Sequence, residues 1–361
     1  MTRSMTADGV ARTVEAAWTG ARARDRLLVG VLVPLAGGYR AGVAVRNALY
    51  DHGWFPSERV PATVVSVGNL SVGGTGKTPT ALWLAHALRR RGRRVGLVAR
   101  GYGKRTPGVV VVGDGQPLVG PAEGGDEAVL LAVRSGLPVV TGERRAEAAR
   151  AAIARFACDT IVLDDGFQHR ALARDADLVL LPAEGLPARL LPAGPLREPA
   201  SALRRARAVL ALGGARPPVV HTPIPAFIGR IVPTAVVVPD EAGGFATHDL
   251  ADIPKRDVVA VAGVARPERF WRLLDDLGVQ VVDRVRFPDH HPYAAGDLVR
   301  LRAASGAHAV VTTEKDLVKL ARLPDIGAIP LHAVRIDLEV DDGERLVDAL
   351  LAPPEVELQR D

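Results

Sequence analysis

Residues 71–78, with the sequence Ser-Val-Gly-Gly-Thr-Gly-Lys-Thr, constrain the fold of this chain more than any other segment. They follow an apolar stretch at 62–67 that predicts a buried strand, and a helix-like stretch comes after them. A glycine-rich turn that joins a strand to a helix and ends in Gly-Lys-Thr is typical of a phosphate-binding P-loop. Ser71 stands where the usual pattern has its first glycine, so Gly73 and Gly74 supply the flexibility here.

The P-loop predicts a site for a nucleoside triphosphate. In such a loop successive backbone N–H groups point at the polyphosphate, and the helix N-terminus adds partial positive charge. We expect the Lys77 ammonium to reach the β- and γ-phosphates and the Thr78 hydroxyl to hold Mg²⁺. The residues predicted to bind the nucleotide are Gly73, Gly74, Thr75, Gly76, Lys77 and Thr78.

Composition limits the class of protein and its partners. The chain has 361 residues, of which 48% are hydrophobic and 24% charged, so it is long enough for two globular domains. Its single cysteine, Cys158, excludes an intrachain disulfide and fits a reducing compartment. A net charge of +5 favours an anionic partner, whereas an aromatic content of only 4% argues against single-stranded nucleic acid.

The order of apolar and amphipathic segments predicts an α/β protein. From residue 62 onward strand-like apolar runs alternate with helix-like runs, which favours a mostly parallel sheet with helices on both faces. A proline- and glycine-rich stretch near 213–232 interrupts this alternation, and the pattern then resumes. We expect a basic membrane-associated segment, a P-loop kinase domain, a linker and a second, smaller α/β domain at residues 1–53, 54–215, 216–233 and 234–361.

The N-terminal segment combines arginines with apolar residues. Arg22, Arg24 and Arg26 precede an apolar run at 27–36, which Pro34 interrupts. We find no apolar span of 20 residues and therefore predict no transmembrane helix. A basic amphipathic element lying on a membrane surface is the favoured interpretation. The alternative is a helix packed against the core of the protein itself.

A second strong signal is the strand-like run at 160–163, which ends in Asp164 and Asp165. Ligands gather at the carboxyl ends of parallel strands, so either carboxylate is a candidate ligand for Mg²⁺ beside the P-loop. The alternative is a turn with a capping aspartate. Gln168 and His169 follow at once and are candidates for contact with phosphate or sugar.

Three further polar segments are candidates for the chemistry. Asp126 precedes a helical run and is either an N-cap or a catalytic base. His290 and His291 follow Asp289, and neighbouring residues on an extended segment point in opposite directions, so they are unsuited to one metal. An imidazole beside a carboxylate can instead orient a base. Residues 312–316, Thr-Thr-Glu-Lys-Asp, weakly resemble a guanine-reading motif, but a capped helix start explains them equally well.

Two rigid loops carry arginines. Arg100 and Tyr102 lie in an Arg-Gly-Tyr-Gly turn, and Arg197 lies in the proline-rich segment 192–199. The planar guanidinium suits bidentate recognition of phosphate, so both loops are candidates for substrate binding. The alternative for each is a loop arginine that faces solvent.

Taken together, these segments resemble the tetraacyldisaccharide 4′-kinase family of lipid A biosynthesis, from about residue 27 to about residue 320. The resemblance also covers Pro-Glu-Arg-Phe at 267–270. It departs at Ala128, where the family has proline, and at residues 265–266, Ala-Arg, where the family has Gly-Asn. It implies two α/β/α domains joined by a two-stranded β linker. It also implies an ATP- and Mg²⁺-dependent kinase that phosphorylates an acylated disaccharide 1-phosphate, as a peripheral protein on the cytoplasmic face of the bacterial inner membrane.

The resemblance also assigns roles. By this resemblance Asp126 is the catalytic carboxylate, His290 or His291 is the catalytic histidine, and Lys77 is the catalytic lysine of the P-loop. The metal-side residues fall on Thr78, Asp164 and Asp165, and the substrate-side candidates are Arg100, Tyr102, Gln168, His169 and Arg197. Two other classes remain open: a membrane-associated P-loop switch or metallochaperone-type NTPase, and a nucleotide-dependent binding module without catalysis. The Asp-His-His cluster and the proline-rich arginine loop favour the kinase.

Overall fold

The computed structural model describes residues 14, 17–18, 23–213, 224–240, 243–305, 309–324, 326 and 329–353. The N-terminal part of the chain forms α2 (Ala23–Asp51), β1 (Thr63–Asn69), α3 (Lys77–Arg90), β2 (Val95–Ala99), β3 (Val110–Asp114), α4 (Pro121–Gly124), α5 (Asp126–Ser135), β4 (Pro138–Thr141), α6 (Arg145–Phe156), β5 (Thr160–Asp164), β6 (Ala176–Pro182), η1 (Ala200–Arg205) and β7 (Ala208–Leu212). The C-terminal part forms β8 (Ala226–Pro239), β9 (Phe245–Asp249), η2 (Leu250–Asp252), β10 (Val258–Ala262), α7 (Pro267–Asp276), β11 (Val281–Arg286), α8 (Ala295–Ser305), β12 (Ala309–Thr313), α9 (Glu314–Leu320), β13 (Leu331–Val340) and α10 (Gly343–Leu351).

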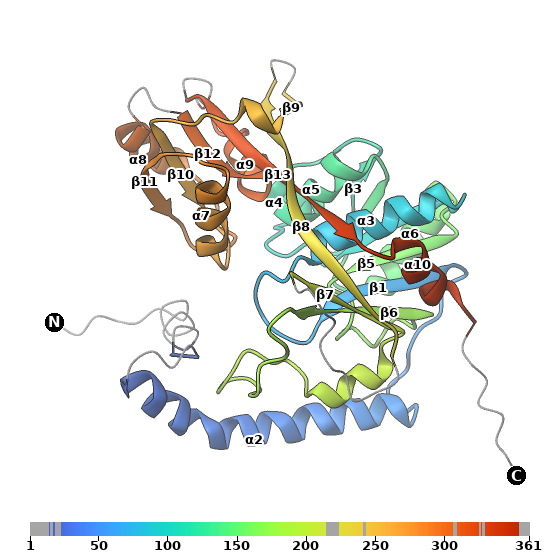
Figure 1. Ribbon diagram of the computed structural model, residues 1–361. Coiled ribbons are helices and arrows are strands. Elements are labelled where there is room, and N and C mark those ends of the chain that lie inside the picture. The colour runs from blue at the N-terminus through green and yellow to red at the C-terminus, as the bar shows by residue number, and fades with distance from the viewer. Residues whose placement is uncertain are drawn as a thin grey trace, which may run out of the picture.

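The strands of the described residues form one continuous 13-stranded sheet, in the order β11-β10-β12-β13-β8-β7-β6-β1-β5-β2-β4-β3, with β9 paired to β8 (Figure 1). We call β1–β7 with α3–α6 the P-loop half, and β9–β12 with α7–α9 the distal half. Most pairs within each half are parallel, as predicted, with β3–β4 an antiparallel exception, and β8, which belongs to neither half, pairs antiparallel with β9. Helices cover both faces of the P-loop half, so the predicted α/β class is confirmed.

Two long strands connect the halves. Strand β8 pairs in parallel with β7 through residues 226–229 and then antiparallel with β13. The expected linker at 216–233 therefore overlaps this strand, because its proline-rich part ends before residue 226 and alternating apolar residues follow. Residues 216–223 of that linker lie outside the described residues. The two halves consequently share hydrogen-bonded strands instead of a loose connector.

Helix α10 returns the chain to the P-loop half, although residues 234–361 were expected to form the second domain. Leu346 and Val347 of α10 are buried in the same cluster as Leu84 and Leu88 of α3. Arg91, just after α3, also pairs with Glu344 at 2.6 Å. The apolar face of α10 packs against apolar side chains of α3, and the burial of this surface fixes α10 on the P-loop half.

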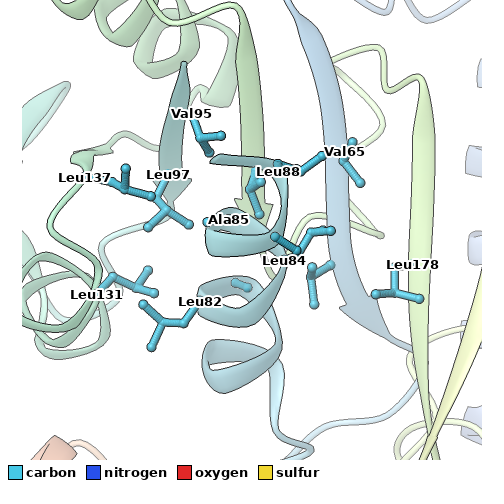
Figure 2. Close-up of a cluster of buried hydrophobic side chains, with 14 of the residues drawn as sticks. Val65, Leu82, Leu84, Ala85, Leu88, Val95, Leu97, Leu131, Leu137 and Leu178 are labelled. Atoms are coloured by element: carbon cyan, nitrogen blue, oxygen red, sulfur yellow. The ribbon is translucent and has the colours of Figure 1, made fainter. Parts of the chain in front are cut away.

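The core of the P-loop half explains why α3 is fixed so firmly. Leu84 and Leu88 of α3 are fully buried against Val65 of β1 and Leu97 of β2 (Figure 2). On the other face of the sheet α6 covers a separate cluster that includes Val64. Because β1 is apolar on both faces and α3 is fixed on one of them, the loop between them has two rigid ends.

Helix α2 is continuous through Pro34 and lies alongside the segment that carries η1 (Figure 1). Its exposed side chains include the large apolar Leu27, Val31, Val33, Leu35 and Val45, together with the arginines Arg24, Arg26 and Arg40. Within the described part of the chain it is the one helix that is long and apolar enough to cross a membrane, by length and composition alone. A helix that lies along a membrane surface meets the same criteria. The C-terminal half of α2 is hydrogen-bonded to the rest of the protein: Tyr39 Oη donates to the Arg197 carbonyl at 3.0 Å, and Asn47 Nδ2 donates to Glu198 at 2.8 Å.

Candidate active site

The P-loop connects the end of β1 to the start of α3. Gly73 and Gly76 have φ angles of 102° and 81°, in the left-handed region that favours glycine. A Cβ on Gly76 would also lie 2.8 Å from the Leu212 side chain. Gly76 caps α3 without any side-chain hydrogen bond, so the first N–H groups of this helix lack a capping side chain. The loop therefore presents main-chain donors and a helix N-terminus, as an anion site requires.

A cavity of about 1070 Å³ lies between the two halves of the molecule. The P-loop half contributes residues 73–79, Arg100, Tyr102 and Glu127 to its walls. The distal half contributes Phe270, His290 and Lys315, and the connecting strands contribute Ile231 and Ile336. The phosphate-binding loop and the Asp-His-His segment thus meet at one cavity although they are far apart in sequence.

Asp164 and Thr78 lie next to each other at the end of β5. The Thr78 hydroxyl donates to Asp164 Oδ2 at 3.3 Å, and Asp164 Oδ1 is buried without a hydrogen-bond partner. Burial, with the charges of Glu127 and Asp165, raises the pKa of Asp164 to about 7. Within the described residues no three His, Cys, Asp or Glu side chains gather around one point. Mg²⁺ commonly takes only one or two protein carboxylates beside phosphates and water, so this oxygen pair fits it.

Asp165 faces the cations of the site. Its φ angle is 54°, and its carboxylate lies 3.8 Å from Lys77 Nζ and 3.1 Å from Arg197 Nη1. The same guanidinium lies 3.4 Å from Gln168 Oε1, and Gln168 Nε2 donates to the Asn69 carbonyl at 2.9 Å. The structure therefore separates the two aspartates, with Asp164 beside Thr78 and Asp165 beside Lys77 and Arg197.

Asp126 contacts His290 across the junction of the halves. Asp126 begins α5 and is 5% exposed, and His290 Nδ1 lies 3.0 Å from each of its carboxylate oxygens. The Tyr102 ring packs on His290 with ring centroids 4.5 Å apart. His291 points elsewhere, because its Nε2 lies 2.9 Å from Asp297 Oδ2 and its ring stacks on Phe287. Of the two histidines that the sequence left open, His290 is the one at Asp126.

The surroundings of Asp126 favour its ionised form. Burial acts to raise the pKa of this carboxyl, but the hydrogen bond with His290 and the charges of Lys315 and Lys319 outweigh it and lower the pKa to about 2. Asp126 Oδ1 also accepts the Glu127 N–H at 2.9 Å. At neutral pH the group is a carboxylate with a fixed orientation, so it can accept a hydrogen bond from a hydroxyl.

A cationic region surrounds His169 in the wall of the cavity. Burial and then the nearby Arg145, Arg174 and Arg100 lower the pKa of His169 to about 4, so its imidazole is neutral. Burial, with Arg100, lowers the pKa of Arg145 to about 10. Neither Arg100 nor Arg145 makes an ion pair with a carboxylate among the described residues. The buried Arg145 and the exposed Arg100 both line the cavity without such a partner, which suits an anionic ligand.

The structure adds residues that the sequence analysis missed. Arg145 at the start of α6 lies in no motif, so nothing in the sequence pointed to it. Arg269 lies in the Pro-Glu-Arg-Phe segment and donates from Nη1 to the Gly74 carbonyl at 3.1 Å. Arg266, where the family has asparagine, lies 3.7 Å from a Cβ placed on Gly73. Both arginines bring positive charge from the distal half to the P-loop.

The segment 312–316 is a capped helix start. The Thr313 hydroxyl accepts the Asp316 N–H at 3.2 Å as α9 begins, which confirms the capping alternative. Asp316 accepts the Gly263 N–H at 2.9 Å, so its carboxylate is engaged in the distal half. Lys315 extends to His290 and is unavailable as a reader of guanine.

Comparisons with known proteins agree with this geometry. A family model described as tetraacyldisaccharide-1-P 4′-kinase matches residues 28–353. The tetraacyldisaccharide 4′-kinase of Anaeromyxobacter dehalogenans (strain 2CP-C) is 45% identical over 340 residues, which cover 87% of both chains. That of Chromobacterium violaceum is 42% identical over 300 residues, covering 82% of this chain and 85% of the relative.

A solved structure points to the same family. LpxK from Aquifex aeolicus, crystallised in complex with ATP, superposes with a TM-score of 0.74 at 32% identity. The match covers 90% of this chain and 98% of that one. The P-loop, the Asp126–His290 contact and the similarity over most of the chain lead to one conclusion: this chain belongs to the tetraacyldisaccharide 4′-kinase family.

Proposed function

We infer that this protein transfers the γ-phosphoryl group of ATP to the 4′-hydroxyl of a tetraacyldisaccharide 1-phosphate, a step of lipid A biosynthesis. The observation that carries this inference is the contact between Asp126 and His290 beside the P-loop cavity. A protein that only binds nucleotide, or hydrolyses it to drive a switch, has no need of an oriented carboxylate–imidazole pair contributed by two halves of the molecule. A kinase needs it to receive the proton of the acceptor hydroxyl.

The P-loop end of the cavity holds the triphosphate in this proposal. Main-chain N–H groups of residues 73–76 and the start of α3 bind the phosphate oxygens, and Lys77 neutralises charge on the β- and γ-phosphates. Arg269 and Arg266 add positive charge from the distal half. Phosphoryl transfer depends mostly on positioning and on charge stabilisation, so binding ATP between both halves serves the chemistry directly.

Thr78 and Asp164 are the proposed ligands of Mg²⁺, because their oxygens adjoin and Asp164 Oδ1 has no other partner. When bound, Mg²⁺ supplies neutralisation of the phosphate charge. Asp165 was also predicted as a metal ligand and stays a prediction. Its observed contacts with Lys77 and Arg197 suit a second task, which is to hold these two cations in place before the nucleotide arrives.

The acceptor binds in the same cavity, with its 4′-hydroxyl next to the γ-phosphate and Asp126. The 4′-hydroxyl gives its proton to Asp126 as its oxygen bonds to the γ-phosphorus and the bond from phosphorus to the β,γ-bridging oxygen breaks, releasing ADP. The anionic 1-phosphate and the sugar hydroxyls of the substrate fit the cationic and polar side chains there. The proposed substrate-binding residues are Arg100, Tyr102, Arg145, Gln168, His169 and Arg197.

An Asp126→Asn variant tests this proposal. We expect transfer of ³²P from γ-labelled ATP to a tetraacyldisaccharide 1-phosphate to fall by about 10²–10⁴-fold in kcat, the usual effect of losing a general base. The KM for ATP should stay within about threefold of wild type, because Asp126 bonds to Glu127, His290 and Lys319 and not to the P-loop residues 73–78.

Two outcomes of the same assay would contradict the proposal. A kcat within about threefold of wild type would remove Asp126 as the base. Label appearing in inorganic phosphate at the same rate with and without lipid, and none in the lipid, would favour an NTPase. The control is Asp252→Asn, an exposed aspartate of η2 in the distal half.

We also propose that α2 lies on the membrane at its cytoplasmic face, where ATP is available. Leu27 and Val31, one turn apart on α2, are 72% and 65% exposed. The double variant Leu27→Asp/Val31→Asp should release the protein from sedimenting liposomes while kinase activity on detergent-dispersed substrate is unchanged. Val282→Asp, at a residue 55% exposed in the distal half, is the matched control. Equal sedimentation of all three proteins would refute this placement.

A further inference from the structure

Two lysines of the distal half approach the Asp126–His290 pair, and no established step of the reaction uses them. Both belong to α9, at positions 315 and 319, one helical turn apart. Their side chains are 15% and 9% exposed, which is unusual for lysine. Buried ammonium groups are retained where several acceptors hold them, so the acceptors of these two groups identify what they do.

Lys315 Nζ has three neighbours at hydrogen-bond distance: Glu127 Oε1 at 3.1 Å, Asp289 Oδ1 at 3.2 Å and His290 Nε2 at 3.1 Å. Burial acts to lower the pKa of Lys315, but Glu127, Asp126 and Asp289 outweigh it and raise it above its ordinary value, so the group is an ammonium. An ammonium has three hydrogens and no lone pair. His290 Nε2 must therefore accept, and the ring proton must lie on Nδ1, from which it is donated to Asp126.

Lys319 acts on the carboxylate itself. Its Nζ lies 3.5 Å from Asp126 Oδ2, 3.3 Å from Asp316 Oδ1 and 5.1 Å from the centre of the Tyr293 ring, and these ion pairs hold it without a hydrogen bond among the described residues. Asp316 is fully buried and is held by the Gly263 N–H and the Thr313 hydroxyl. The titratable and charged side chains that face the pair are Tyr102 from the β2–β3 segment, Glu127 from α5, Asp289 from the β11–α8 turn, and Lys315, Asp316 and Lys319 from α9.

We propose that Lys315 and Lys319 are positioning residues for the transfer: Lys315 fixes the ring tautomer of His290, and Lys319 keeps Asp126 ionised. His290 then serves as a neutral hydrogen-bond donor that orients the carboxylate, and it takes up no proton during turnover. Asp126 is the terminal acceptor of the hydroxyl proton. This inference rests on the proposed role of Asp126, which the Asp126→Asn experiment tests separately.

The tautomer is tested without touching either lysine. In asparagine the side-chain amide nitrogen takes the place of imidazole Nδ1, whereas in glutamine it takes the place of Nε2. We expect His290→Asn to keep at least tenfold more kcat than His290→Gln in the labelled-ATP assay. Equal losses, or better activity of the glutamine variant, would overturn the assignment of the proton to Nδ1. If Asp126→Asn is inactive while the two His290 variants are equally active, Asp126 remains the proposed base and only the assignment of the ring proton to Nδ1 is wrong.

The two lysines differ in what they contact, so their variants should differ in pH profile. For Lys319→Met we expect the acidic limb of kcat to move to higher pH, with the plateau at high pH within about threefold of wild type. For Lys315→Met we expect the same shift together with a plateau at least tenfold lower, because the ring of His290 is no longer fixed. Wild-type profiles for both variants, or a pH-independent loss in Lys319→Met, would overturn the proposal. Lys255→Met, at an exposed lysine bonded to the Leu277 carbonyl, is the control, and melting temperatures report folding.

Discussion

Glu198 anchors α2 to the P-loop half, and its removal gives the sharpest prediction about the N-terminal helix. The carboxylate is fully buried and pairs with Arg205 through two hydrogen bonds of 2.9 and 3.1 Å. From α2 it accepts Asn47 Nδ2 at 2.8 Å and Arg46 Nη2 at 3.2 Å. Burial raises the pKa of Glu198, but Arg205, Asn47 and Arg46 outweigh this effect and hold it below its ordinary value, so the charge is present at neutral pH.

The change Glu198→Ala leaves the cations unpaired. Release of α2 breaks the bonds that the helix itself makes to Glu198, from Arg46 and Asn47, and in the variant these bonds are absent before opening; a hydrogen bond to a charged group contributes about 1.5–3 kcal/mol. Because each 1.4 kcal/mol is a factor of about ten, amide hydrogen exchange within the C-terminal half of α2 should accelerate at least a hundredfold. Glu198→Gln keeps the shape and two acceptor positions, so we expect a smaller acceleration.

The control distinguishes this buried pair from a surface pair. Glu344 pairs with Arg91 but is 76% exposed, and Glu344→Ala should change exchange or stability by less than about 1 kcal/mol. The reasoning would be refuted if α2 exchange in Glu198→Ala stayed within tenfold of wild type. It would equally be refuted if β1 and α2 lost protection together, since that result indicates global unfolding instead of release of the helix.

Two other predictions concern the site. Arg269→Ala should raise the KM for ATP about 10–100-fold, because a charged hydrogen bond contributes about 1.5–3 kcal/mol. Arg272→Ala, on the same helix, should leave this KM unchanged, because Arg272 bonds to the Glu268 carbonyl. Equal effects of the two substitutions would exclude a specific contact between Arg269 and the P-loop. The pKa of Asp126 falls from 3.8 to about 2 on folding, so its carboxylate adds about 2 kcal/mol of stability above pH 4, and this contribution disappears as the pH falls toward 2. The difference in urea-unfolding free energy between wild type and Asp126→Asn should therefore shrink over that range. A constant difference would contradict the lowered pKa of Asp126.

The continuous sheet explains how the halves act on one another. Strands β8 and β13 pair with each other and extend from one half into the other, so the cavity walls are connected by hydrogen bonds. At this junction Arg134 of α5 pairs with Glu314 of α9 at 2.5 Å, and Arg335 of β13 pairs with the same carboxylate at 3.0 Å. Arg134 and Glu314 also line the cavity. A ligand that binds there contacts both sides of a charged junction, and the placement of His290 over Asp126 depends on that junction.

The sequence by itself determined the features that consecutive residues encode. The P-loop at 71–78, the acidic end of β5, the capped start of α9 and the parallel α/β class depend on local backbone preferences and on short hydrophobic periods. Similarity over most of the chain then determined the family. The hydrophobic pattern alone did not predict strand β13 or helix α10, because their apolar residues have a partner only when the chain returns to β8 and α3.

Only the tertiary structure decided which side chains meet. Asp126 and His290 are 164 positions apart, and nothing local distinguishes His290 from His291 until the β11–α8 turn is placed against α5. The roles of Asp164 and Asp165 separate for the same reason, since one carboxylate is buried beside Thr78 and the other faces Arg197. Lys315 looked like part of a helix start, and its hydrogen bond to His290 exists only where α9 packs against α5. Local pattern specifies each element, whereas the distances between charged atoms depend on how the elements pack.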